Sequence, residues 1–210
     1  MPRARAIEQD NATGAVSYWE AADHQSLADR NGVSLADYIH ALYGFLRQAK
    51  AKNILMIGGG GGTLATMLSR MGVAVTVLDV DPVSFQIARR YFHMPASVEC
   101  HIADGQAFLK RTARRYDAIV LDAFADEIIP RHFLKGAFFE LVKAHLTRNG
   151  LFLINIVIKD DSDKAADRIG WRLRETFTGV RLLDSDGWEN RNAVIAAGAV
   201  AGLAKPTLLM

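Results

Sequence analysis

The sequence predicts one doubly wound α/β domain with a mainly parallel sheet. Short apolar runs alternate with segments of helical periodicity through most of the 210 residues, and this alternation is typical of a parallel sheet covered by helices on both faces. Five consecutive glycines, Gly58 to Gly62, follow the first apolar run, and aspartates follow the next three runs. Because ligands of doubly wound domains bind at the carboxyl ends of the strands, these glycines and aspartates are the candidate binding residues.

Helix caps and periodicity place several elements. Ser34 is predicted to cap the first helix, whose apolar residues recur at helical spacing. These residues are Leu35, Ile39, Leu42 and Leu46. Asp81 and Pro82 form a cap and first-turn pair for a later helix. Asn149 and Gly150 mark a turn before an unbroken apolar run.

The complete order of elements follows from the same patterns. Strands are predicted at 53–57, 73–78, 98–102, 116–121, 151–158, 180–183 and 193–199. Helices are predicted at 63–71, 82–92, 104–111 and about 162–177, with one more between Pro130 and Leu146. The last strand has no helical spacer before it, which favours antiparallel pairing. We therefore divide the chain into a polar N-terminal extension (1–33), one catalytic α/β domain (34–201) and a tail (202–210).

Composition narrows the classes of function. Lys and Arg number 25 against 23 Asp and Glu, and this small, scattered excess does not favour nucleic acid as a partner. Cys100 is the only cysteine, so an intramolecular disulfide is excluded. The histidines lack metal-ligand spacing, no apolar run reaches the ~18 residues of a membrane span, and the N-terminus has no secretory signal pattern. We expect a cytoplasmic protein that uses no metal.

The glycine run and the first aspartate after it predict a nucleoside site. Glycines permit positive φ and let backbone N–H groups approach a ligand closely, and five in a row exceed what a tight turn needs. Asp79 lies about twenty residues beyond Gly58, where an acid can accept hydrogen bonds from both ribose hydroxyls. Asp81 is better explained as a helix cap.

The next strand ends carry further acids. Asp104, followed by Gly105, can accept a hydrogen bond from an adenine amino group or cap the next helix, and the sequence leaves both roles open. Asp122 ends an apolar strand, so it can take a proton from an attacking amine or cap the following turn. Asp126 and Glu127 either hold a cationic acceptor or face solvent.

A nicotinamide cofactor is a weaker alternative. Gly60, Gly62 and Ala65 satisfy the dinucleotide pattern, with Asp79 in range. However, a dehydrogenase needs a substrate domain for which little chain is left, and a dinucleotide does not explain Asp104. The glycines are not followed by the lysine of a phosphate-binding loop, which excludes a nucleoside triphosphatase.

Four segments share a specific order and spacing. They are 54–64 (ILMIGGGGGTL), 78–82 (LDVDP), 103–109 (ADGQAFL) and 116–122 (YDAIVLD). Together they resemble the spermidine synthase family of polyamine aminopropyltransferases over about residues 38–158. The resemblance implies a Rossmann-like fold of the class I S-adenosylmethionine-dependent methyltransferase type, and often a homodimer.

The resemblance also implies a donor, either decarboxylated S-adenosylmethionine or S-adenosylmethionine itself. The residues that would bind it are Gly58, Gly59, Gly60, Gly62, Asp79, Val80, Asp104, Gly105 and Gln25. Asp79 would hold the ribose, and Asp104 with Gly105 the adenine. Gln25 resembles a glutamine that approaches the donor.

On the acceptor side, Asp122 would be the base that activates a small amine. Tyr38 resembles the tyrosine of the family's acceptor site, and Asp126 would add negative charge there. Three departures stand against full agreement. Gly61 replaces the family's aspartate that grips the aminopropyl amine, the acid after Asp122 is shifted by one position, and the family's N-terminal β-domain is nearly absent.

The leading hypothesis is therefore a transferase that moves an aminopropyl or related group to an amine. A methyltransferase on the same fold is the runner-up, because Gly61 no longer repels the carboxylate of S-adenosylmethionine. A non-catalytic nucleotide-binding protein is the third hypothesis, since a short N-terminus would leave the cleft open.

Overall fold

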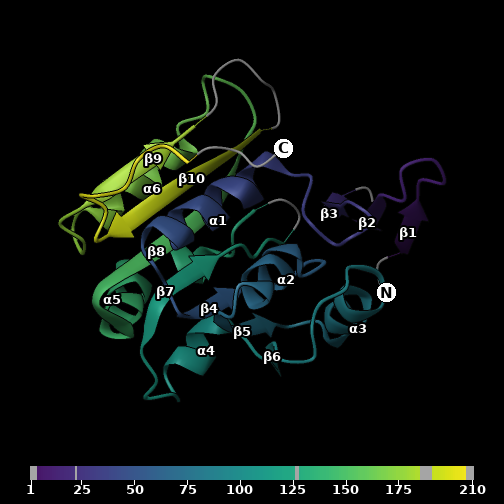
Figure 1. The fold of residues 1–210 in the computed structure, drawn as a ribbon. Helices are drawn as coiled ribbons and strands as arrows, with labels where there is room; N and C mark the ends of the chain where they lie inside the picture. Colours follow the sequence, from purple (N-terminus) through teal and green to yellow (C-terminus); the bar gives the residue numbers. More distant parts are fainter. Residues whose placement is uncertain (1–3, 22, 126–127, 185–190, 207–210) are drawn as a thin grey trace.

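The chain forms one large sheet and one small sheet. The structure is a computed structural model that describes residues 4–21, 23–125, 128–184 and 191–206. The small sheet contains β1 (Arg5–Gln9), β2 (Val16–Glu20) and β3 (Asp23–Ala28). The large sheet contains β4 (Asn53–Ile57), β5 (Ala74–Asp79), β6 (Glu99–Ile102), β7 (Tyr116–Leu121), β8 (Leu146–Ile158), β9 (Val180–Leu183) and β10 (Arg191–Gly198). Figure 1 shows the small sheet beside α3 (Pro82–Tyr91), far from β9.

The large sheet has the strand order β6-β5-β4-β7-β8-β10-β9. The strands from β6 to β8 pair in parallel, whereas β10 is antiparallel to both β8 and β9. The predicted doubly wound, mainly parallel sheet and the antiparallel last strand are therefore confirmed. The strand order reverses between β4 and β7, and such a switch point opens a crevice for ligands at the carboxyl ends of the strands.

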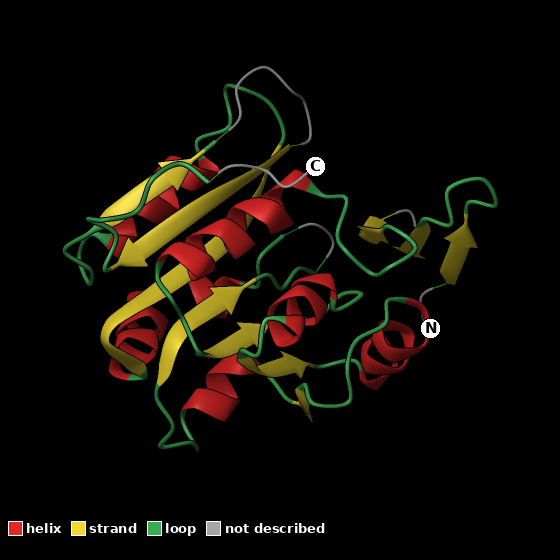
Figure 2. Cartoon of the chain, in the orientation of Figure 1, coloured by secondary structure: helices red, strands yellow, loops and turns green. Residues whose placement is uncertain are grey.

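Helices cover both faces of this sheet (Figure 2). The remaining helical elements are α1 (Asp37–Gln48), α2 (Thr63–Arg70), α4 (Gly105–Leu109), the 3₁₀ helix η1 (Arg131–Leu134), α5 (Gly136–Ala144) and α6 (Ala165–Leu173). Alternate residues of β4 point to opposite faces, so Ile54 packs against the α1 and α2 side, and Leu55 packs against the α5 and α6 side. Two buried apolar layers therefore enclose the central strands beneath the crevice.

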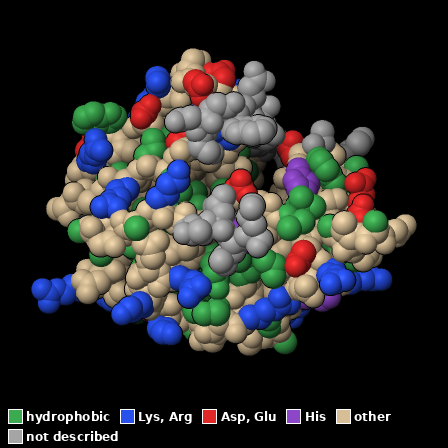
Figure 3. Space-filling model, turned by 45° about the horizontal axis from the view of Figure 1, so that its top comes forward, with side chains coloured by type: hydrophobic (Ala, Val, Ile, Leu, Met, Phe, Trp, Pro, Cys, Tyr) green, Lys and Arg blue, Asp and Glu red, His purple; other side chains and the backbone are tan. Residues whose placement is uncertain are grey.

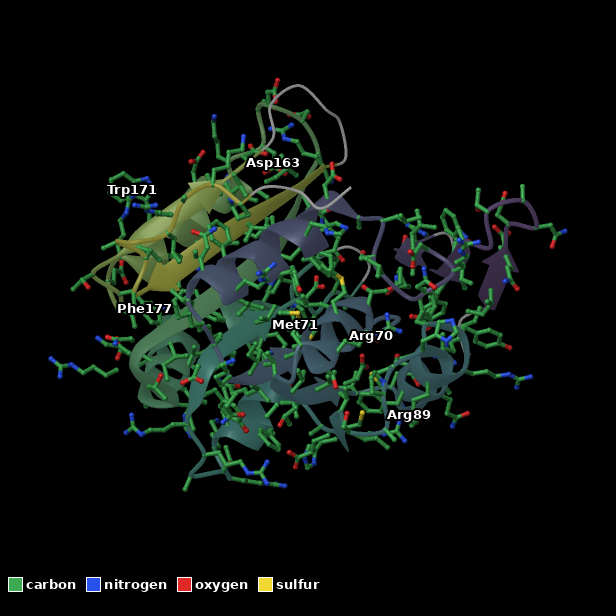
Figure 4. All side chains as sticks on the ribbon, viewed as in Figure 1. Arg70, Met71, Arg89, Asp163, Trp171 and Phe177 are labelled. Atoms are coloured by element: carbon green, nitrogen blue, oxygen red, sulfur yellow. The ribbon has the colours of Figure 1, made fainter. Side chains whose placement is uncertain are left out.

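The helix α6 shows how one face of a helix packs on the sheet. Ala166, Ile169 and Leu173 face the sheet and are buried. Trp171 points away from it (Figure 4) and is 68% exposed. Among the described residues, the helices are too short and too polar to span a membrane.

The N-terminal residues form a small sheet that the sequence did not predict. Their own core is limited to Val16, Tyr18 and Ala28, which pack against Ile87 and Phe92 of the α3 region. All residues of β1 except Ile7 are exposed, so its sequence lacks the alternation of apolar and polar residues that identifies a half-buried strand.

Polar contacts attach the N-terminal residues to the large domain. The Arg5 guanidinium contacts Asp81 at 2.5 Å and Glu20 at 3.1 Å. Arg70 of α2, labelled in Figure 4, donates to the carbonyl oxygen of Asn31 at 2.6 Å. The extension therefore lies against the helices that border the crevice.

Three sequence expectations are wrong in detail. The first helix begins at Asp37 rather than after Ser34, because Ser34 forms a β-bridge with Ala28 and belongs to the return from the small sheet. Leu35 is consequently 49% exposed. Asn149 and Gly150 do not form a turn. They lie within β8, whose pairing with β7 shifts register at this point.

The third difference lies between residues 130 and 146, where we expected one helix. The structure has η1, then an extended Lys135, and then α5. The extended backbone of Lys135 interrupts the helical path. His132 therefore lies on η1, from which it approaches the strand ends.

Candidate active site

The carboxyl ends of β4, β5, β6 and β7 open into one cleft of about 690 Å³. This volume is within the usual range for small-molecule sites. The glycine loop, Asp79, Asp104 and Asp122 line it, together with Gln25 and Ser26 of β3. Elsewhere on the surface, Lys and Arg side chains are spread over the left and lower parts of the view in Figure 3.

The glycine loop follows the shape that its composition predicts. Gly58, Gly60 and Gly62 all have positive φ, a backbone conformation that residues with a side chain rarely adopt. At Gly58 a Cβ atom would also lie 2.1 Å from the carbonyl oxygen of Asp122. The loop after β4 is therefore packed directly against the backbone that carries the candidate base.

Gly58→Ala is expected to destabilise the protein strongly, by about 3 kcal/mol or more, because positive φ and a backbone collision act together. Gly72→Ala is the matched control, since Gly72 has φ +75° but open space around its Cα. That change should cost only about 1–2 kcal/mol. Thermal unfolding followed by circular dichroism measures both, and equal losses would show that the contact with Asp122 is unimportant.

Asp79 organises the loop and still faces the cleft. Its Oδ2 accepts from the backbone N–H of Gly59 at 3.0 Å, and its Oδ1 accepts from that of Asp81 at 2.9 Å. Burial raises the pKa of Asp79, although these backbone donors oppose the shift. Each carboxylate oxygen can accept a second hydrogen bond, so Asp79 keeps acceptor capacity for a ligand. The next residue, Val80, lines the cleft and is 71% exposed.

Asp104 caps α4 and also contacts a histidine. Its Oδ1 accepts from the backbone N–H of Ala107 at 2.9 Å, so the helix-cap role is confirmed. Its Oδ2 lies 2.8 Å from Nε2 of His132, which the sequence did not single out. Gly105 has a packing role, because a Cβ there would lie 2.6 Å from Cγ2 of Ile57. Asp104 and Gly105 both line the cleft.

Asp122 is the candidate general base, and three elements surround it. Oδ1 accepts from Nδ2 of Asn155 on β8 at 2.8 Å, and Oδ2 lies 3.5 Å from the hydroxyl of Tyr38 on α1. Burial raises the pKa of Asp122 to about 6, while the two donors act in the opposite direction. Burial and the Asp122 carboxylate raise the pKa of Tyr38 well above its usual value, so its hydroxyl stays protonated.

Asn155 and Asn192, which were not predicted as site residues, both line the cleft. Asn155 is 1% exposed, and an amide in the middle of an otherwise apolar strand was the available signal. Asn192 gave no such signal, because its place beside Asn155 depends on the antiparallel register of β10 on β8. Predicted residue Tyr38 does reach Asp122, whereas Asp126 lies outside the described residues.

The fourth loop glycine, Gly61, has a partner from the N-terminal sheet. The N–H of Gly61 donates to Oγ of Ser26 at 2.7 Å, and that hydroxyl donates to the carbonyl oxygen of Gln25 at 2.6 Å. A Cβ at position 61 would lie 2.8 Å from Cβ of Ser26 and 3.0 Å from Phe92. Ser26 therefore fills the room that a side chain at position 61 would need.

The polar groups that line the cleft are carboxylates, amides, hydroxyls, two imidazoles, the Arg5 guanidinium and backbone N–H groups. In the part of the chain that the structure describes, no three His, Cys, Asp or Glu side chains gather as a metal site.

Comparison with known proteins agrees with this geometry. A family model, the spermine/spermidine synthase domain, matches residues 37–157. A polyamine aminopropyltransferase of Vibrio vulnificus is 35% identical over 121 residues, which cover 54% of this chain and 40% of that protein. The chain spans two fifths or less of the length of the first curated relatives that it matches.

Solved structures show the same fold. A probable spermidine synthase from Corynebacterium glutamicum is similar with a TM-score of 0.82 and 20% identity, covering 92% of this chain and 76% of that chain. Human methyltransferase-like protein 13 in complex with SAH has a TM-score of 0.62 and 20% identity, with 82% of each chain covered. The predicted class I methyltransferase-like, Rossmann-like fold is thus confirmed. Because the family model covers more than half of the sequence, the chain belongs to the spermine/spermidine synthase family.

Proposed function

We propose that this protein transfers an alkyl group from an S-adenosyl sulfonium donor to an amine, with Asp122 as the proton acceptor. The observation that carries this proposal is the placement of the buried Asp122 carboxylate at the end of β7, in the same cleft as Asp79 and Asp104. The first candidate group is aminopropyl, because the family and the Vibrio vulnificus relative are those of polyamine aminopropyltransferases.

The donor's nucleoside fits the residues present. Asp79 retains free acceptor positions for ribose hydroxyls, and Val80 offers an apolar surface beside it. The β5 and β6 strands are neighbours, so Asp104 lies next along the cleft edge for the adenine amino group. Gly58 to Gly60 and Gln25 line the same cleft and would border the reactive end of the donor.

The reaction needs one proton transfer to the protein. The amine nitrogen attacks the carbon attached to the sulfonium, the carbon–sulfur bond breaks, and the sulfur leaves as a neutral thioether. The product nitrogen then carries one proton too many, and the Asp122 carboxylate accepts it. Tyr38 and Asp126 would hold the acceptor amine, which we propose to be a small molecule. Cytoplasmic location and a homodimer remain predictions.

Methyl transfer is the second candidate, and Gly61 is the observation that favours it. Position 61 has no carboxylate to hold a cationic aminopropyl arm, and Ser26 fills the space instead. A neutral hydroxyl there does not repel the carboxylate of S-adenosylmethionine. The fold is also that of human methyltransferase-like protein 13, whose structure contains SAH.

Calorimetric titration of the purified protein with S-adenosylmethionine, and separately with its decarboxylated form, tests the proposal. Tighter binding of the decarboxylated donor favours aminopropyl transfer, and tighter binding of S-adenosylmethionine favours methyl transfer. Asp79→Ala serves as the control, because it should weaken both donors by about 10-fold or more through lost hydrogen bonds. Binding of neither donor would overturn the proposed function.

A further inference from the structure

Two asparagines connect the candidate base to the antiparallel edge of the sheet. Nδ2 of Asn155 donates to Oδ1 of Asp122 at 2.8 Å. Nδ2 of Asn192 donates in turn to Oδ1 of Asn155 at 3.0 Å. Asn192 is on β10 opposite Val157, so it is the diagonal neighbour of Asn155 on the same face of the sheet.

The order of these hydrogen bonds fixes which end of the Asn155 amide faces the base. An ionised carboxylate only accepts hydrogen bonds, so it is stabilised when Asn155 presents its NH₂ group. The amide oxygen of Asn155 then faces away from Asp122, and this side chain is only 1% exposed to solvent. A buried acceptor without a partner costs free energy, and Asn192 supplies the donor that satisfies it.

Without Asn192, the amide of Asn155 loses this directional constraint. In the reversed orientation its oxygen would face Asp122, where it repels a carboxylate and accepts a hydrogen bond from a protonated carboxyl group. That change would stabilise the protonated form of Asp122 relative to the carboxylate and so raise its pKa.

We propose that Asn192 and Asn155 form a positioning chain that keeps Asp122 ionised and oriented for the amine. This inference rests on the proposed function only in giving Asp122 the role of base. Neither asparagine needs to touch the substrate, and Asn192 acts through Asn155.

Other groups that face Asp122 do not replace this chain. Tyr38 of α1 is the one titratable side chain that contacts it among the described residues, at the longer distance of 3.5 Å. Asp79 ends β5, two strands away across β4, which corresponds to about 10 Å. Asp104 ends β6, one strand farther.

A double-mutant cycle in the 210-residue protein tests this chain of hydrogen bonds. The variants are Asn155→Leu, Asn192→Leu and the double variant, and the readout is the pKa of the Asp122 carboxyl from its ¹³C NMR shift. The signal is identified by its loss in Asp122→Asn. Asn149→Leu is the matched control, because Asn149 is exposed on the same strand and does not line the cleft.

Asn155→Leu should raise the pKa of Asp122 by about one unit, the effect of one hydrogen bond to a charged group. Asn192→Leu should raise it by a smaller amount in the wild-type background and leave it unchanged when Asn155 is already leucine. Asn149→Leu should have no effect. An equal shift from Asn192→Leu in both backgrounds, or no shift from Asn155→Leu, would overturn the chain.

The pH dependence of kcat/KM separates this inference from the proposed function. The NMR readout needs no turnover, so it tests the chain even in a protein with no transferase activity. If the chain and the base role are both correct, the acidic limb of the profile moves with the pKa of Asp122. A limb that stays in place while the pKa moves would reject Asp122 as the base and leave the chain intact.

Discussion

Asp122→Asn is expected to lower the turnover of amine transfer by about 10²–10⁴-fold, the usual contribution of a well-placed general base. The asparagine is nearly the same size, and its Oδ1 can still accept from Nδ2 of Asn155. The cleft should therefore keep its shape, and the donor should bind with unchanged affinity in a calorimetric titration. Only the proton acceptor is lost.

The control for this variant is Asp37→Asn. Asp37 is exposed in the first turn of α1, one residue before Tyr38, and it does not line the cleft. Its turnover should equal that of the wild type. If Asp122→Asn retains wild-type turnover, another group takes the proton and the assignment of Asp122 is wrong.

The raised pKa of Asp122 adds a pH dependence with a definite sign. Only the ionised carboxylate accepts a proton, so kcat/KM of the wild type should rise with pH through about 6. Stability should move in the opposite direction. The folded protein holds the Asp122 proton up to a higher pH than the unfolded chain does, so this contribution is present below the unfolded pKa and is lost as pH rises through about 6.

Asp122→Asn has no carboxyl group at this position, so it avoids the loss of folding stability that the wild type undergoes as pH rises. The melting temperature of the variant minus that of the wild type should therefore be more positive at pH 8 than at pH 4. At pH 4 the wild-type carboxyl is already protonated in the folded protein. Such a trade between stability and activity is common at catalytic sites.

Much of the site could be predicted because parallel strands deliver their carboxyl ends to one edge. Asp79, Asp104 and Asp122 each follow a short apolar run, and the topology then brings them into one cleft without further information. The glycine loop was equally predictable, since its positive φ values demand glycine.

The parts that could not be predicted depend on pairings between distant segments. His132 reaches Asp104 only because η1 ends before α5 begins, and Asn192 reaches Asn155 only through the register of β10 on β8. The small N-terminal sheet was hidden because β1 has almost no buried side chain, so its sequence carries no periodic signal.

The double change Gly61→Asp with Ser26→Gly is expected to shift donor preference toward decarboxylated S-adenosylmethionine. The family resemblance places an acid at position 61 against the aminopropyl amine, and Gly61 has no positive φ that would strain an aspartate. Space is the obstacle, because the new Cβ would lie 2.8 Å from Cβ of Ser26. Gly61→Asp alone should therefore weaken both donors.

Removing the Ser26 side chain opens that room, and the Phe92 ring, 3.0 Å from the new Cβ, needs to move by a few tenths of an ångström. A hydrogen bond between charged groups contributes about 1.5–3 kcal/mol, which corresponds to about 10- to 100-fold in the ratio of the two dissociation constants. Calorimetric titration with both donors measures this ratio.

Gly61→Asn with Ser26→Gly is the control that isolates the charge, because it has the same shape as the double variant and no carboxylate. Its donor ratio should stay close to that of Ser26→Gly alone. If the aspartate and asparagine versions give the same ratio, the side chain at position 61 does not reach the donor arm, and the loss of the acid no longer favours methyl transfer. If only the aspartate version changes the ratio, a carboxylate at position 61 selects the donor. The absence of that carboxylate, with Ser26 in its space, then determines which sulfonium donor this cleft accepts.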